Sequence, residues 1–232
     1  MKTGASEAYG KIPTQVLTNA RCLPEFFIFS DMDQEIAGYR IRDSLDKVSD
    51  DVKMNNDNFD LYFRQKECQV DQSSCNKKHD VAKMGWNLDK YKNVHIAEKT
   101  WKLRPNYDWY LYTDADTYVV WSTMVEWLKK LDPKKPQYLG SVALLGGFPF
   151  GHGGSGYLVS HAAMREMFDG KENVAMKYDT EAKKTCCGDF VFAQALKDQT
   201  GVSVKNMVSS IPRVLSRRRC LYNGIVYDSS KC

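Results

Sequence analysis

Short apolar stretches alternate with longer amphipathic stretches along the 232-residue chain. The runs PEFFIFSD (24–31), WYLYT (109–113) and YLGSVALL (138–145) are typical of buried strands, because each is short, apolar and bounded by polar residues. The glycine-dense stretch GGFPFGHGGSGYLVS (146–160) leads into another short apolar strand. These patterns predict a sheet whose strands are separated by longer connections.

Two stretches in the first half of the chain have a helical pattern. Residues 88–105 are predicted to form a helix that ends before Pro105, and 38–48 is a second candidate. Residues 50–80 are polar and rich in Asn, Asp and Lys, so they predict mostly a surface excursion.

Three further helices are predicted in the second half. Thr123 and Glu126 have the spacing of a capping box, and Ser160 is placed to cap the next helix. A last helix is predicted from near Asp189 to just before Gly201. The apolar positions that define one face in the first two of these helices are Met124, Trp127, Leu128, Leu131, Ala163, Met164, Met167 and Phe168.

Alternating strands and helices predict a three-layer α/β/α sandwich around a mixed sheet, as one domain over 1–232. The apolar content of 43% and the charged content of 27% are ordinary for a folded protein. The net charge of +4 is too small to indicate nucleic acid, and 217–219 reads as a solvated basic tail. No targeting segment or membrane segment is predicted, because no apolar run is long enough.

The cysteine spacing predicts disulfide chemistry rather than a zinc site. Seven cysteines include no C-x2-C pair, and Cys68 and Cys75 lie in a polar segment that a disulfide would close into a small loop. The count favours an oxidising compartment, and the odd number leaves one thiol over.

Two acids interrupt the most aromatic part of the chain, DWYLYTDADTYVVW (108–121). Asp114 and Asp116 follow an apolar strand, and ligands of α/β folds bind at the carboxyl ends of strands. Residues two apart on a strand face the same side, so both carboxylates can reach one hard cation such as Mn²⁺ or Mg²⁺. The alternative interpretation is a polar turn.

Two other features are candidates for chemistry. The glycines of Gly153-Gly154-Ser155-Gly156 allow a ligand to approach the backbone closely, although a flexible turn has the same composition. Asp189 is either a helix N-cap or a general base beside a cleft. A Walker lysine pattern is absent from the sequence.

Three segments, in order, resemble one known family. NYDWYLYTDADTYVV resembles the metal-binding segment of glycosyltransferase family 31, which includes Fringe and the core 1 β1,3-galactosyltransferases. GGSGYLVS resembles the glycine-rich segment of that family, and CCGDFVFAQAL resembles its acidic segment. The N-terminal KTGASEAYGKIPTQVLTNARCLPEFFIFSDMD is similar to the fungal branch of these Fringe-like proteins.

The resemblance implies a GT-A fold, a UDP-sugar donor, Mn²⁺ with Mg²⁺ as an alternative, and a Golgi-type lumen in which family members are membrane-anchored. It implies that Asp189 is the catalytic base. It also implies that Asp114 and Asp116 hold the metal, with Asp116 the more direct ligand. The positions implied to bind the donor are Asp31, Asp114, Asp116, Gly153 and Gly154.

The function expected from this resemblance is inverting transfer of a hexose, with galactose favoured, from a UDP-sugar to a glycan or glycoprotein acceptor. The alternative is a non-catalytic Fringe-like protein that binds UDP or a glycan, because family members carry a later histidine ligand and no histidine follows His161. A magnesium-dependent phosphate hydrolase is disfavoured, because no further acid cluster has ligand spacing. We also expect the domain to be incomplete at both ends.

Overall fold

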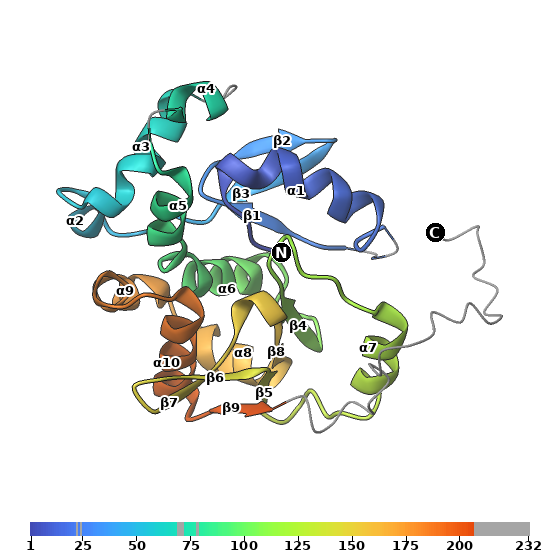
Figure 1. Cartoon of the computed structure of the whole chain (residues 1–232). Helices are drawn as coiled ribbons and strands as arrows, with labels where there is room; N and C mark the ends of the chain where they lie inside the picture. Colours follow the sequence, from blue (N-terminus) through green and yellow to red (C-terminus); the bar gives the residue numbers. More distant parts are fainter. Residues whose placement is uncertain (22, 24, 69–71, 78, 207–232) are drawn as a thin grey trace.

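The computed structural model describes residues 1–206 apart from 22, 24, 69–71 and 78, and it describes no side chain at 73 or 75. Two neighbouring sheets and a small hairpin are covered by helices (Figure 1). The strands are β1 (Ile28–Ser30), β2 (Gln34–Ile36), β3 (Tyr39–Asp43), β4 (Trp109–Tyr112), β5 (Tyr138–Gly140), β6 (Val142–Leu145), β7 (Phe148–Gly151), β8 (Tyr157–Ser160) and β9 (Val204–Asn206).

The helices lie before, between and after these strands. The α-helices are α1 (Ala5–Leu17), α2 (Asp50–Lys53), α3 (Asp60–Glu67), α4 (Gln72–Asn76), α5 (Val81–Asp89), α6 (Lys92–Leu103), α7 (Trp121–Leu128), α8 (His161–Phe168), α9 (Asp179–Lys184) and α10 (Gly188–Thr200). The short 3₁₀ helices are η1 (Asp57–Phe59), η2 (Gly153–Ser155) and η3 (Ala175–Tyr178).

The first residues of the chain join the two sheets. One sheet has the order β1-β3-β2 and the other β4-β8-β5-β9, and both combine parallel with antiparallel pairs. Lys2 forms parallel bridges to Phe29, in β1, and to Asp114, just after β4. The N–H of Thr3 donates to the carbonyl of Phe29 at 2.9 Å, and the N–H of Ala115 donates to the carbonyl of Lys2 at 2.9 Å. Residues 1–3 therefore hold the end of β4 at a fixed distance from β1.

Helices cover both faces of the sheets, which confirms the predicted three-layer α/β arrangement. On one face, α1 packs Ile12 against Ile28 and Ile41, and α7 packs Trp127 against the second sheet. On the other face, α6, α8 and α10 contribute to the largest hydrophobic cluster. The layering follows from the sequence, because each of these helices has one apolar face to bury.

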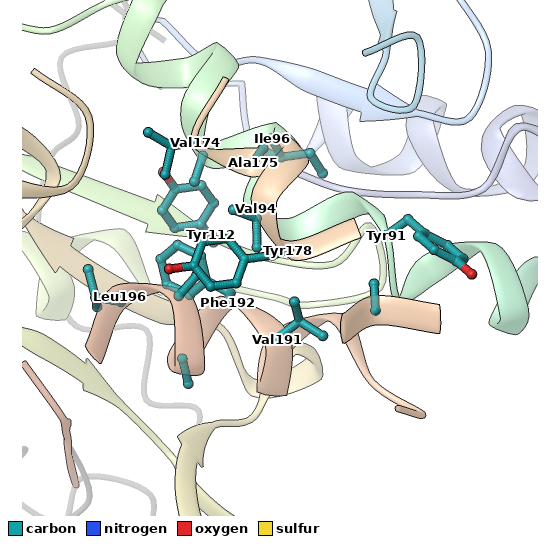
Figure 2. Packing of buried hydrophobic residues seen from close by; sticks show 14 of the residues in the cluster. Tyr91, Val94, Ile96, Tyr112, Val174, Ala175, Tyr178, Val191, Phe192 and Leu196 are labelled. Carbon is teal, nitrogen blue, oxygen red and sulfur yellow. The ribbon is translucent and has the colours of Figure 1, made fainter. Parts of the chain in front are cut away.

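The start of α10 is fixed by aromatic packing against the second sheet. Phe192 stacks on Tyr157 with ring centroids 5.1 Å apart and also contacts Tyr112. Figure 2 shows this cluster, in which side chains of α10 meet those of α6 and β4. A Cβ atom at Gly188 would lie only 2.7 Å from the carbonyl oxygen of Asp89, so the first turn of α10 contacts the end of α5 directly.

The prediction of a helix over 38–48 is wrong. Ala37 and Gly38 have φ of 54° and 78°, and they form the tight turn between β2 and β3. After this turn, Ile41 and Asp43 are buried, whereas Arg40 is exposed and Arg42 is half-buried. The period is that of a strand, and the left-handed turn before it commits the chain to a hairpin.

Other elements differ from the predictions in detail. Residues 50–80 carry many exposed side chains, as predicted, but this stretch also contains α3 and buries Phe59 and Tyr62 in the main core. The predicted strand 138–145 is divided into β5 and β6, which belong to different sheets. Thr123 lies within α7, whose N-cap residue Val120 makes no side-chain cap, so the capping box is wrong although the helix is present.

The remaining predictions of secondary structure are confirmed. The strands at 24–31 and 109–113 contain β1 and β4, and the helix predicted at 88–105 contains α6. Ser160 caps α8, because its hydroxyl oxygen accepts the N–H of Ala163 at 3.3 Å. Within the described part of the chain, no helix combines the length and the apolar character needed to span a membrane.

Candidate functional site

Asp114 and Asp116, in the turn after β4, line a pocket of about 510 Å³. Its walls come from the start of α1, from one side of α5 and from this turn. The residues that line it are Lys2, Thr3, Gly4, Ser6, Glu7, Lys11, Val81, Ala82, Gly85, Trp86, Asp89, Lys92, Asp114, Ala115 and Asp116. The strand-end position predicted for the two acids is therefore the edge of a cavity large enough for a small-molecule ligand.

Asp114 is the more buried of the two acids, with 29% of its side chain exposed. Lys2 Nζ lies 3.3 Å from Asp114 Oδ1 and 2.5 Å from Asp89 Oδ2. Burial raises the pKa of Asp114 above its ordinary value, the charge of Lys2 opposes this rise, and Asp89 adds to it. The ionised form of Asp114 is thus destabilised by burial and stabilised by a positive partner, here Lys2.

Asp116 is more open to solvent, with 62% of its side chain exposed. Its partner is Lys11, whose Nζ lies 3.0 Å from Asp116 Oδ2 and 2.7 Å from Glu7 Oε2. Burial lowers the pKa of Lys11, but hydrogen bonds to Glu7 and Asp116 outweigh it and the pKa is raised. Each acid of the D-x-D pair therefore has its own lysine.

The donor atoms of this pair fit a hard divalent cation. Carboxylate oxygens are the ligands that Mg²⁺ and Mn²⁺ prefer. Among the residues that the structure describes, no group of three or more His, Cys, Asp or Glu side chains is placed to hold a metal. The described side chains thus offer two carboxylates, and oxygens of a ligand or of water would have to complete the coordination of an ion.

The glycine-rich loop connects the turn that carries these acids to Asp189. The N–H of Gly153 donates to Asp189 Oδ2 at 2.7 Å, and the hydroxyl of Thr117 donates to the carbonyl of Gly154 at 2.8 Å. Asp114 and Gly153 also line one small cavity. The three sequence segments singled out from the pattern therefore meet in space.

Asp189 is the second residue of α10, one position inside the helix rather than at its N-cap. Its Oδ1 accepts the N–H of Phe190 at 2.9 Å, while Oδ2 is held by Gly153, and the residue is half-buried. The adjacent Cys186 and Cys187 form a disulfide immediately before α10. The carboxylate is thus held in place through both oxygens and remains partly accessible.

Asp31 lies behind the pocket rather than in its wall. It is fully buried, and its Oδ1 accepts the N–H of Ala5 at 2.7 Å and lies 3.3 Å from Lys92 Nζ. In this position its carboxylate orients the start of α1 and the Lys92 ammonium, which does line the pocket. Contact between Asp31 and a nucleotide stays a prediction.

Several functional candidates were not found from the sequence. Lys2, Lys11 and Asp89 lie far from Asp114 along the chain, and no local pattern marks them as its neighbours. The Cys186–Cys187 disulfide was also missed. Cys68 is disulfide-bonded, but the side chain of Cys75 lies outside the described part, so the predicted Cys68–Cys75 loop stays a prediction.

Comparison with known proteins places the chain by family. No curated protein matches it. The model of the Fringe-like family matches residues 49–209, which is more than half of the chain and includes Asp114, Gly153 and Asp189. That family indicates glycosyltransferase activity in general. With the observed α/β architecture and the match over this length, the chain belongs to the Fringe-like family.

Proposed function

We propose that the protein is an inverting, metal-dependent glycosyltransferase that moves a hexose, with galactose favoured, from a UDP-sugar to a glycan or glycoprotein acceptor. The observation that supports this most strongly is the glycine loop. It is hydrogen-bonded at Gly153 to Asp189 and at Gly154 to Thr117, one residue after Asp116. A candidate base and a candidate cation site are thereby held at one place.

The charge of the pocket supports a requirement for a cation. Four carboxylates (Glu7, Asp89, Asp114 and Asp116) face three ammonium groups (Lys2, Lys11 and Lys92), which leaves one net negative charge. Such a pocket repels a diphosphate unless positive charge is added. Asp114 and Asp116 would hold Mn²⁺ or Mg²⁺, which when bound would neutralise the charge that develops on the leaving diphosphate.

Asp189 would act as the general base. Its Oδ2 and Oδ1 are oriented by the N–H groups of Gly153 and Phe190, which keeps the carboxylate in one direction. A carboxylate so held can accept the proton of an acceptor hydroxyl while that oxygen attacks the anomeric carbon. One base and one displacement give inversion at that carbon.

The chemistry of the cysteines supports a lumenal compartment of the secretory pathway, such as the Golgi. Cys186 and Cys187 are joined, and Cys68 is also disulfide-bonded. Disulfides of this kind persist in oxidising compartments and are rare in the cytosol. The acceptor would then be a glycan or a glycoprotein that passes through the same compartment.

Release of UDP from UDP-sugars, with and without Mn²⁺, tests this proposal. We expect release that depends on Mn²⁺ and increases when an acceptor is present. Chelation with EDTA should abolish release, and added Mn²⁺ should restore it. Release that is equal with and without metal would contradict the proposed metal dependence, and no binding of UDP in Mn²⁺ would contradict the donor assignment.

A non-catalytic, UDP- or glycan-binding protein is the second candidate, and the lysine pairing favours it. Lys2 and Lys11 already neutralise Asp114 and Asp116, so the two acids are stable without a cation. In this case UDP or a glycan would bind in calorimetry, but no UDP would be released from UDP-sugars with any acceptor. The release assay therefore separates the two candidates.

A further inference from the structure

One side of α5 forms a wall of the pocket opposite the acids. The residues of α5 that line the pocket are Val81, Ala82, Gly85, Trp86 and Asp89. Their spacing of one, three or four positions places them on a single helical face. Apart from Asp89 at the end, this face carries no charge, so it is an apolar wall in a pocket whose other charged residues lie on its other sides.

Trp86 is the exposed side chain on this wall. It is 65% exposed, whereas Trp101 and Trp127 are 6% and 7% exposed and the other two tryptophans are half-buried. An indole placed in the wall of a cavity offers a flat apolar face to whatever enters. Core packing does not account for its position, because Trp86 belongs to none of the hydrophobic clusters formed by the described residues.

Gly85 beside it leaves the wall flat. Its φ is not in the left-handed region, and a Cβ atom there would have no heavy atom within 4 Å. Neither backbone conformation nor close packing requires glycine at this position, and glycine weakens a helix relative to alanine. What glycine provides here is open space next to the indole, inside the pocket.

The two sides of the pocket suit a ligand with one charged part and one flat apolar part. Lys2 and Lys11 lie with Asp114 and Asp116 on the charged side, where a diphosphate and its cation would bind. The apolar side is the wall formed by Gly85 and Trp86. A nucleoside diphosphate sugar offers two such flat parts, the nucleobase and the face of the sugar ring.

The position of α5 relative to α10 decides between these parts. The carbonyl oxygen of Asp89 lies against Gly188, the residue before the candidate base Asp189. Trp86 precedes Asp89 by three residues, which is about 4.5 Å along a helix axis. The Asp89 end of the wall therefore lies beside the candidate base Asp189, and Trp86 is less than one helical turn from it. We place the transferred sugar at this end of the pocket and the nucleobase at the far end.

We propose that Trp86, with Gly85 beside it, is a platform for the apolar face of the donor hexose, and that it favours a galactose-type ring. In galactose the axial 4-hydroxyl points away from one face, so the C–H groups of C3, C4 and C5 form a continuous apolar patch. Glucose lacks this patch because its 4-hydroxyl is equatorial. This inference rests on the proposed function, since it assigns the sugar end of the same donor.

Calorimetry of the full chain in Mn²⁺ tests the platform, with UDP, UDP-galactose and UDP-glucose as ligands. Trp86→Ala should weaken UDP-galactose binding about tenfold and leave UDP binding within about twofold, because only the stacked ring is lost. Trp86→Phe should keep most of the affinity. The loss for UDP-glucose should be smaller than that for UDP-galactose.

Fluorescence and a matched glycine pair give independent readouts. UDP-galactose should change the emission of the wild type, and Trp86→Phe should remove that change. Gly85→Ala should raise the melting temperature yet weaken UDP-galactose binding. Gly10→Ala, in α1 and equally unobstructed, should raise the melting temperature only, because Gly10 is outside the pocket.

The outcomes against the platform are distinct from failure of the proposed function. Equal losses for UDP and UDP-galactose in Trp86→Ala, or no loss for either, would overturn the platform while the donor site stands. Equal losses for the galactose and glucose donors would overturn the preference for galactose. A wild type that binds neither UDP nor any UDP-sugar would overturn the proposed function, and the platform with it.

Discussion

The backbone N–H of Gly153 donates a hydrogen bond to Oδ2 of Asp189 at 2.7 Å. This contact joins residues that are 36 positions apart, and a Cβ atom at Gly153 would lie 3.3 Å from the same oxygen. The glycine is therefore required by close approach to a carboxylate rather than by its own backbone angle. The position of the candidate base and the path of the glycine loop depend on each other.

Gly153→Ala should displace the Asp189 carboxylate by a few tenths of an ångström. Because a small misplacement of a catalytic group slows a reaction strongly, we expect transfer to fall about tenfold or more while UDP affinity is kept. Gly10→Ala is the matched control, since a Cβ there would meet no heavy atom within 4 Å and Gly10 does not line the pocket. Equal activity of the Gly153 variant and the wild type would show that the contact does not position the base.

Asp189→Asn separates the chemical role of the carboxylate from its structural role. Asn provides one acceptor oxygen where Asp provides two, so one of the N–H groups of Gly153 and Phe190 loses its partner, and we expect a stability loss of about 1 kcal/mol. Loss of a general base should reduce transfer on the order of 100- to 10,000-fold. Thermal melting measures the first effect and transfer rates the second, while UDP calorimetry should show unchanged donor binding, because the proposed metal site is at Asp114 and Asp116. Substantial transfer by this variant would require another base.

Asp116→Asn should abolish the dependence of UDP binding on Mn²⁺ without unfolding the protein. Most of the Asp116 side chain is exposed and its ion pair is with Lys11, also partly exposed, so the melting temperature should change little. Calorimetry with UDP in Mn²⁺ and in EDTA gives the test. Lys11→Met is the control, because it removes the same ion pair but leaves the carboxylate. If Asp116→Asn binds UDP in Mn²⁺ as the wild type does, the metal assignment is wrong.

Glu98 should make stability depend on pH in the acid range. Burial raises the pKa of Glu98, but the hydrogen bond from Lys102 and the N–H of Ala175 outweigh it, so the pKa lies below its ordinary value of 4.5. A depressed carboxyl pKa contributes stability above about pH 4.5, and that stability is lost as the pH falls through the folded-state pKa. Glu98→Gln should lose about 1 kcal/mol at pH 7 and flatten the acid side of the melting profile.

Lys102→Met separates the two partners of Glu98. It removes the ion pair at 2.8 Å but leaves the carboxylate to accept the N–H of Ala175. Its effect on the acid side of the profile should be smaller than that of Glu98→Gln. Identical acid profiles for Glu98→Gln and the wild type would mean that this carboxyl group does not contribute to the pH dependence.

The sequence by itself determined the elements whose pattern is local. The strand that ends at Tyr112, the Ser160 cap of α8 and the helix that ends at Thr200, just before Gly201, were all predictable, because periodicity and end residues act within a few positions. The placement of Asp114 and Asp116 at a strand end was predictable for the same reason. The hairpin at Ala37 and Gly38 was missed, since its charged residues also suit a helix.

Only the tertiary structure decided what surrounds the candidate site. Lys2 and Lys11 pair with Asp114 and Asp116 because the first residues lie between β1 and β4 and α1 follows them over the sheet. The fully buried position of Asp31 depends on the same arrangement. The two lysine–aspartate pairs join residues more than a hundred positions apart, and no rule on local spacing reaches that far. They arise from how helices and strands pack rather than from their local pattern.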